Sequence, residues 1–230
     1  MKYMGSKRKI AKDLWGVIKQ HINKDYDYYI EPFCGGCDMI EVVEYKKRIA
    51  CDNNKYLIDC FKLLQNGWNP PKFISENNYK YVKNNKDKFD NGFVGYVGFN
   101  SYGEKLWGGY RRDKIKKRDY WLEHYNHMIK QINKLKGVEF ICDDYKNLII
   151  NNAIIYCDPP YKNTTKYTTD FNHNEFWDWV RKNSTNNIIF ISEYEAPEDF
   201  VNIYKKSINN TLVRDTGSKK GVERLWIKNI

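Results

Sequence analysis

The chain has 230 residues, of which 41% are hydrophobic, and it carries a net charge of +10. This length fits one globular domain or a domain with a large insertion. Because no run approaches the roughly 20 apolar residues of a membrane span, and residues 1–9 lack the apolar core of a signal peptide, we expect a cytoplasmic protein.

The first third of the chain alternates helical and extended patterns. Apolar spacing predicts a helix over residues 9–22, a strand over 27–33, a short helix over 38–46, a strand over 48–51 and a helix over 54–65. Strands that alternate with helices favour a parallel sheet with helices on both faces.

The alternation stops at about residue 67. Residues 75–91 are polar and rich in Tyr and Lys, and residues 93–110 carry repeated glycines that predict strands and tight turns. A long helix is predicted over 115–135. Residues 61–140 hold 16 Lys and Arg against 8 Asp and Glu, so most of the excess positive charge lies here. A basic segment with interleaved aromatics suits nucleic acid; the alternative is a solvated, Lys-rich surface.

The alternation then resumes. We predict strands over 138–142, 153–157 and 188–192, helices over 145–150 and 172–182, and a terminal antiparallel pair over 203–208 and 222–227. The prediction is therefore an α/β catalytic domain formed by residues 1–66 and 137–230. A small helical and β-hairpin insertion at 67–136 interrupts it.

The chain reads Asp158-Pro159-Pro160-Tyr161 directly after the predicted strand 153–157. Ligands of open α/β sheets bind at the carboxyl ends of strands. Asp158 offers a carboxylate acceptor there, the two prolines stiffen the backbone and remove two N–H donors, and Tyr161 offers a ring for stacking. This combination suits an amino group on an aromatic ring. A simple Pro-Pro turn is the alternative.

Two other strand ends carry polar or glycine residues. The strand 27–33 runs into Gly35 and Gly36, which permit close approach of the backbone to a ligand, and the strand 48–51 is followed by Asp52, placed to accept from both hydroxyls of a ribose. No G-x-G-x-x-G motif for a pyrophosphate is present. The sequence thus predicts a site for an adenosine compound without a pyrophosphate.

The six cysteines are expected to be reduced. Cys34 and Cys37 form a C-x-x-C pair, but no second pair or His pair completes a set of four zinc ligands at the usual spacing. We therefore expect no metal.

Four motifs stand in the order of a known family: Tyr3-x-Gly5-Ser6-Lys7, Glu31-Pro32-Phe33-x-Gly35-Gly36, Asp52-Asn53-Asn54 and Asp158-Pro159-Pro160-Tyr161. With them the chain resembles the Dam-like DNA adenine methyltransferases from end to end, including Glu223-x-Leu225-Trp226. The resemblance implies a Rossmann-like sheet. It also implies methyl transfer from S-adenosylmethionine (AdoMet) to the exocyclic amine of a flipped adenine in double-stranded DNA, by a monomer or a dimer on DNA.

The resemblance also implies roles for single residues. The cofactor would contact Tyr3, Lys7, Pro32, Phe33, Cys34, Gly35, Gly36, Cys37, Asp52, Asn53, Cys142, Asp143 and Asp158, with Asp144 the other candidate beside its adenine. Asp158 to Tyr161 would hold the target base. Two residues also have a purely structural alternative. Lys7 would be part of a solvated basic tail, and Asp52 would be the N-cap of the helix that follows it.

Target reading is predicted for a hairpin over residues 99–112. Its candidate DNA contacts are Asn100, Tyr102, Lys105, Trp107, Arg111 and Arg112, joined by Arg118 just beyond it. The alternative is that the aromatic side chains pack the hairpin against the rest of the protein. Two rival functions are a non-catalytic DNA-binding protein on a methyltransferase scaffold and an amino-methyltransferase that acts on cytosine or RNA.

Overall fold

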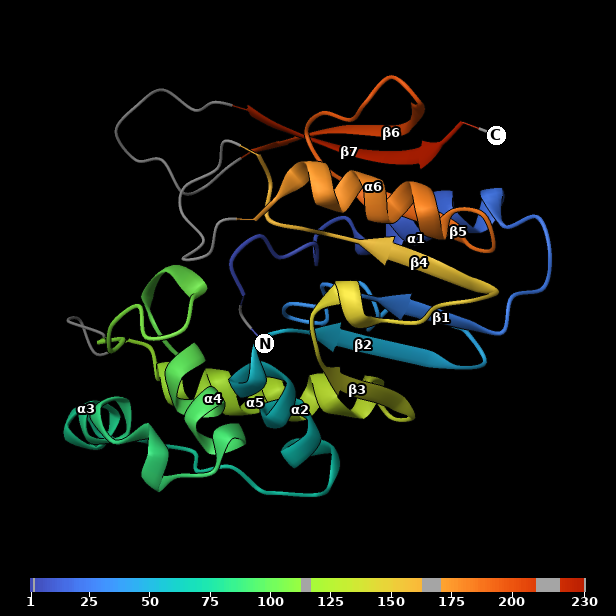
Figure 1. Ribbon diagram of the computed structural model, residues 1–230. Coiled ribbons are helices and arrows are strands. Elements are labelled where there is room, and N and C mark those ends of the chain that lie inside the picture. Colours follow the sequence, from blue (N-terminus) through green and yellow to red (C-terminus); the bar gives the residue numbers. More distant parts are fainter. Residues whose placement is uncertain (2, 113–116, 163–170, 210–219, 230) are drawn as a thin grey trace.

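A computed structural model describes residues 1, 3–112, 117–162, 171–209 and 220–229. A seven-stranded sheet runs through its centre in the order β3-β2-β1-β4-β5-β7-β6 (Figure 1). The strands are β1 Tyr28–Glu31, β2 Arg48–Asp52, β3 Val138–Cys142, β4 Ala153–Cys157, β5 Ile188–Ser192, β6 Phe200–Asn209 and β7 Lys220–Lys228. This arrangement confirms the predicted α/β class and the strand at each predicted position.

The first five strands of the sheet, from β3 to β5, are parallel, whereas β7 pairs antiparallel with both β5 and β6. The predicted terminal antiparallel pair is thus confirmed. The chain order reverses between β1 and β4, which is the switch point where doubly wound sheets bind ligands. In Figure 1 the carboxyl ends of β1, β2 and β4 point toward the side where residues of the middle third gather.

Helices cover both faces of the sheet. They are α1 Ala11–His21, α2 Lys55–Gln65, α3 Glu76–Asn84, α4 Asn91–Phe99, α5 Tyr120–Lys134 and α6 His173–Asn183, with 3-10 turns η1 Lys86–Lys88, η2 Tyr102–Glu104 and η3 Tyr145–Asn147. Alternate residues of β4 divide between the faces: Ile154 and Tyr156 share a core with α1, α2, α4 and α5, while Ile155 and Cys157 share the other core with α6. None of the described helices combines the length and the apolar character that crossing a membrane requires.

The predicted helix over 38–46 is wrong, because the structure has only hydrogen-bonded turns at 38–42. The Arg48 guanidinium donates to the carbonyl oxygens of Ile40 and Val43, at 3.1 and 3.3 Å. Those carbonyls therefore bond to a side chain of the following strand, β2, instead of extending a helix. The predicted helix over 145–150 is also reduced, to the 3-10 turn η3, beyond which Leu148 is extended.

The glycine-rich stretch 93–110 was predicted as strands and turns, but its first part forms helix α4. The Asp90 side chain caps this helix by accepting from the N–H groups of Gly92 and Phe93. A Cβ built on Gly95 would lie 1.9 Å from the carbonyl oxygen of Tyr56 in α2. Gly95 therefore permits close packing of α4 on α2, which the local sequence does not reveal.

Helix α5 begins at Tyr120, later than predicted, after Asp119 caps it by accepting from the N–H groups of Trp121 and Leu122. Residues 115 and 116 of the predicted helix lie outside the described residues. Trp121, Met128 and Leu135 join the same core as α1 and α2. The end of the 67–136 segment thus packs on the sheet, and the division of the chain into two domains stays a prediction.

Candidate active site

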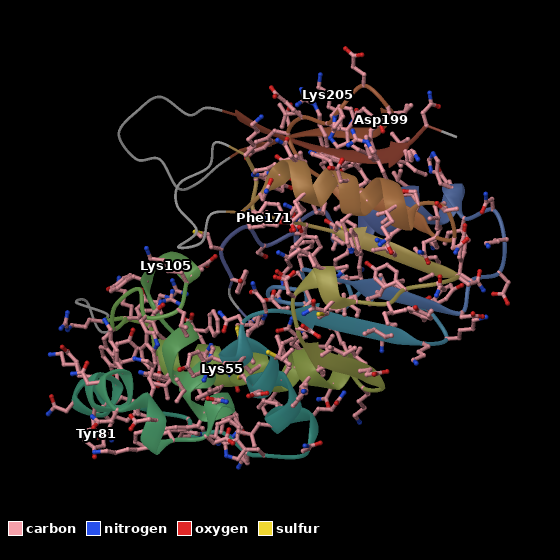
Figure 2. The ribbon with its side chains drawn as sticks, in the orientation of Figure 1. Lys55, Tyr81, Lys105, Phe171, Asp199 and Lys205 are labelled. Atoms are coloured by element: carbon pink, nitrogen blue, oxygen red, sulfur yellow. The ribbon has the colours of Figure 1, made fainter. Side chains whose placement is uncertain are left out.

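A cavity of about 620 Å³ opens at the carboxyl ends of β1, β2 and β4. It brings together predicted residues from four parts of the chain, namely Tyr3, Lys7, Phe33, Cys34, Gly35, Gly36, Asp52, Asn53, Asp158, Pro159, Pro160 and Tyr161. Phe171, which also lines the cavity, is labelled in Figure 2 on the side toward which these strands point. Strand ends that are adjacent in a parallel sheet meet at one edge, and for this reason segments far apart in sequence share the cavity.

Asp52 stands at the end of β2 and ties the glycine loop to the sheet. Its Oδ2 accepts from the Gly35 N–H at 3.1 Å, and its Oδ1 accepts from the Asn54 N–H at 3.0 Å. Burial raises the pKa of Asp52, while these two N–H donors oppose the rise. The N-cap of α2 is Asn54, whose side chain accepts from Leu57 N–H. The alternative that Asp52 is this N-cap is therefore wrong.

The glycine loop packs directly on Tyr3. Gly35 has φ of +44°, and a Cβ there would meet the Tyr3 ring at 3.0 Å; a Cβ on Gly36 would lie 2.8 Å from the Cβ of Tyr3. Side chains at either position would push the N-terminal segment off the loop. The two glycines thus let a bare backbone line the cavity beneath Tyr3.

A buried charged cluster lies beside the Asp-Pro-Pro-Tyr turn. The Lys7 Nζ is 3.2 Å from Asp158 Oδ1 and 3.2 Å from Glu223 Oε2, and it donates to the Tyr161 hydroxyl at 2.7 Å. Tyr161 in turn donates to Glu223 Oε2 at 2.9 Å. Lys7 is only 7% exposed, so the alternative of a solvated basic tail is wrong.

Burial dominates the charge states of this cluster. It raises the pKa of Asp158 to about 6, with Lys7 opposing the rise and Glu223 adding to it. Burial alone would lower the pKa of Lys7, but Asp158 and Glu223 outweigh that effect and the pKa is raised. At pH 7 the lysine is therefore charged and the Asp158 carboxylate is mostly ionised.

Further acidic groups face the same cavity. Glu31 is buried and accepts from the Tyr29 hydroxyl at 2.8 Å, and burial holds its pKa well above the usual range. Asp38 accepts from Ser6 and from Arg8 at 2.7 Å. Even without Glu31, carboxyl groups outnumber cations in the lining, which contains Asp38, Asp52, Asp144, Asp158, Glu175 and Glu223 against Lys7 and Lys146. The cavity thus favours a ligand with positive charge.

Four predicted cofactor residues are not among those that line the cavity: Pro32, Cys37, Cys142 and Asp143. Cys37 is fully buried and Cys142 is exposed. After β3 the carboxylate that lines the cavity is that of Asp144. The rings of Phe33 and Tyr145, whose centroids lie 4.9 Å apart, also line it. Asp144, the other candidate, thus lines the cavity, whereas Cys142 and Asp143 do not.

The predicted reading hairpin is a loop closed by one antiparallel bridge between Ser101 and Tyr110. It contacts the N-terminal segment, because the Met4 N–H donates to the Glu104 carbonyl oxygen at 2.8 Å and the Tyr3 and Phe99 rings lie 5.7 Å apart. The loop therefore packs against Tyr3 and Met4, two residues that line the cavity. Lys105 is exposed on it and is labelled in Figure 2.

The predicted DNA contacts differ in exposure. Asn100 is 1% exposed and donates to the Tyr120 carbonyl oxygen, and Trp107 packs against Tyr79 with ring centroids 5.2 Å apart. For Trp107 the alternative is therefore correct: its ring packs the hairpin against the rest of the protein. Arg112 is exposed but bonded to Glu76 through Nε at 2.8 Å.

Among the other candidates, Tyr102 is 49% exposed and its hydroxyl donates to the Arg112 carbonyl oxygen at 3.1 Å. Arg111 and Arg118 lie over the Tyr120 ring, at 4.4 and 4.8 Å from its centroid.

Sequence reasoning missed several side chains that the fold brings to the cavity, above all Glu223, Glu31 and Asp38. The signal for Glu223 was present in the motif Glu223-x-Leu225-Trp226, to which no role was attached. No group of three or more His, Cys, Asp or Glu side chains suited to a metal ion occurs within the part of the chain that the structure describes.

Comparison with known proteins supports one family. The family model described as D12 class N6 adenine-specific DNA methyltransferase matches residues 3–106 and 91–211, which together span most of the chain. The search of curated proteins found no match. The match confirms the resemblance inferred from the four motifs.

Proposed function

Because the chain belongs to the D12 class N6 adenine-specific DNA methyltransferases, we propose that it transfers a methyl group from AdoMet to a flipped adenine in duplex DNA, with Asp158 to Tyr161 holding the base. The observation that carries the proposal is that this turn, at the carboxyl end of β4, opens onto the same cavity as Asp52 and the Gly35-Gly36 loop. An acceptor for an amine and an acceptor for a ribose thus face one space.

The residues present fit AdoMet. Asp52 would accept from the ribose hydroxyls, and Asp144 with Phe33 and Tyr145 would enclose the adenine. The acidic lining suits the positive charges of the sulfonium and the amino group. Tyr3 and the glycine loop would border the methionine part. When bound, AdoMet supplies an electrophilic methyl group on its sulfonium sulfur.

The chain's own residues would prepare the nucleophile. An adenine amine is a poor nucleophile, because its lone pair is delocalised into the ring. The Asp158 carboxylate and the Pro159 carbonyl oxygen would accept its two hydrogens, which favours sp³ character and aims the lone pair at the methyl group. Tyr161 would stack on the ring. Positioning and preorganised charge therefore supply the catalysis.

DNA would enter beside the loop over 99–112. Extrusion of a base costs a few kcal/mol, which contacts between basic side chains and phosphates can offset. Exposed Lys105 and the arginines at 111, 112 and 118 would supply such contacts. We assign residues 67–136 to target recognition on this basis. The enzyme would work as a monomer and without a metal.

A methyl-transfer assay tests the proposal. Purified protein is incubated with AdoMet carrying a labelled methyl group and duplex DNA, and the product is digested to nucleosides for chromatography. We expect the label in N6-methyladenine. Label in N4-methylcytosine, or transfer to RNA alone, would favour the rival amino-methyltransferase, and no transfer would favour a non-catalytic DNA-binding protein.

Asp158→Asn is the matched variant, since it keeps the shape of the side chain and removes its charge. We expect turnover to fall by about 10² or more, as for the loss of a preorganised polar group, with AdoMet binding retained. Turnover equal to wild type at saturating DNA and cofactor would remove Asp158 from the proposed role.

A further inference from the structure

Glu223 has no role in the proposed methyl transfer, although its carboxylate contacts Lys7 and Tyr161 beside Asp158. Glu223 lies on β7, where its backbone pairs with Lys206 of β6. That ladder is made by main-chain groups, so it does not need this carboxylate. The side chain is 17% exposed, and it points at Lys7 and Tyr161.

Lys7 is held by three acceptors, one for each of its ammonium protons. They are Asp158 Oδ1 and Glu223 Oε2, each at 3.2 Å, and the Tyr161 hydroxyl at 2.7 Å. Without Glu223, the ammonium would have one carboxylate partner in this cluster and would move toward Asp158. The acceptor that the target amine needs would then be taken up by the lysine.

Tyr161 is fixed by the same carboxylate. Its hydroxyl accepts from Lys7 and donates to Glu223 at 2.9 Å, and its ring meets Tyr194 edge-on with centroids 4.7 Å apart. A hydrogen bond at the hydroxyl end and a ring contact at the side set the plane of the aromatic ring. This plane determines where a base can stack.

We propose that Glu223 is a positioning residue for methyl transfer, which shares Lys7 with Asp158 and anchors the Tyr161 hydroxyl. The proposal rests on the function proposed above for Asp158 and Tyr161. Two carboxylates around one ammonium also leave the cluster with one net negative charge. That negative charge stabilises the positive charge that develops on the adenine amine during methyl transfer.

The negative charge of Glu223 raises the pKa of Asp158. Besides Glu223, the described titratable groups that interact with Asp158 include Lys7, Tyr161, Tyr156, Glu31, Glu193, Tyr194 and Cys157. Burial raises the pKa of Asp158 to about 6, Lys7 lowers it and Glu223 raises it. Removal of the Glu223 charge should therefore lower this pKa, which a change of packing alone would not do.

The test is Glu223→Gln, with the exposed Glu198→Gln as the control for loss of one carboxylate. The Asp158 carboxyl is followed by NMR of protein labelled with ¹³C-aspartate, assigned by its loss in Asp158→Asn. In Glu223→Gln we expect its titration midpoint to fall by roughly half a pH unit or more, while Glu198→Gln leaves it unchanged. An unmoved midpoint in Glu223→Gln overturns the proposal.

Kinetics supply the second readout. With adenine-containing duplex DNA, kcat of Glu223→Gln at pH 8 should fall by about 10- to 100-fold, the range for a lost hydrogen bond to a charged group, with KM for AdoMet nearly unchanged. A kcat within twofold of wild type overturns the proposal. If wild-type protein methylates no adenine, the function proposed above fails, while the NMR titration still decides whether Glu223 sets the charge of Asp158.

Tyr161→Phe continues the test if Glu223→Gln lacks the circular dichroism spectrum and melting temperature of wild type. It removes only the hydroxyl through which Glu223 holds the Tyr161 ring. The kcat should therefore fall by about 10-fold or more, with KM for AdoMet nearly unchanged. A kcat within twofold of wild type would overturn the proposal.

Discussion

A single added methyl group would disrupt the contact between α4 and α2. A Cβ on Gly95 would lie 1.9 Å from the Tyr56 carbonyl oxygen and 2.8 Å from its carbonyl carbon. Real Cβ atoms essentially never approach other atoms closer than 3.0 Å. The neighbour is helix backbone, which cannot turn aside as a flexible side chain can. In Gly95→Ala the two helices must therefore separate by about 1 Å.

The expected cost combines two effects of opposite sign. Forcing a methyl group into a packed interface typically costs about 1–3 kcal/mol, and backbone contact places this site at the upper end. Replacing glycine by alanine inside a helix returns about 1 kcal/mol. We expect Gly95→Ala to lower the free energy of unfolding by about 2 kcal/mol, which for a chain of this size corresponds to a melting temperature roughly 4–8 °C lower.

Gly16→Ala is the matched control, since Gly16 also lies inside a helix but a Cβ there would meet nothing within 4 Å. It should raise the free energy of unfolding by about 0.5–1 kcal/mol. Urea denaturation followed by circular dichroism gives both values, with an unchanged slope showing that the unfolding reaction is the same. If Gly95→Ala is as stable as Gly16→Ala, α4 does not sit against α2 in solution, and the reasoning is refuted.

Three further predictions concern the site. The pKa of Asp158 is raised to about 6, and the proposed mechanism needs its ionised carboxylate to accept from the amine. We therefore expect kcat/KM to fall about tenfold per pH unit as the pH drops below that value. A profile of kcat/KM that is flat to pH 5 would contradict this. Asp52→Ala should weaken AdoMet binding by about 1–3 kcal/mol with little change in DNA affinity, and calorimetry showing an unaltered cofactor affinity would exclude the ribose role. Arg111→Ala should weaken binding to cognate and scrambled duplexes alike and reduce the salt slope by about one, whereas Arg112→Ala should do less because Glu76 already holds its guanidinium; equal effects in a salt series would disprove that difference.

The sequence by itself determined the parts of the protein that depend on local patterns. Apolar runs marked the strands, and apolar spacing marked the starts of α2 and α6 within a residue of the observed bounds, although the N-cap of α2 is Asn54 and not the Asp52 considered from the sequence. Asp52 and Asp158 could be placed at strand ends because a parallel sheet brings those ends to one edge. The motif order then indicated the family.

The tertiary structure alone decided what depends on partners distant in the chain. The glycines of α4 signal a turn by their local conformational freedom, and only the backbone of α2 at Tyr56 shows that they permit close helix packing. Arg48 donates to the carbonyl oxygens of Ile40 and Val43, where a helix was predicted, and also to those of Lys134 and Lys136, far along the chain.

Glu223 illustrates the same limit at the active site. Its carboxylate lies on β7, far along the chain from both Lys7 and Tyr161, and reaches them only once β7 has joined the sheet beside β5. Local sequence encodes the conformational preference of the backbone and the spacing of buried apolar residues, because both depend on residues that are close together in the chain. Which charges meet in the low-dielectric interior depends on how the strands are ordered, and that order is a property of the whole fold.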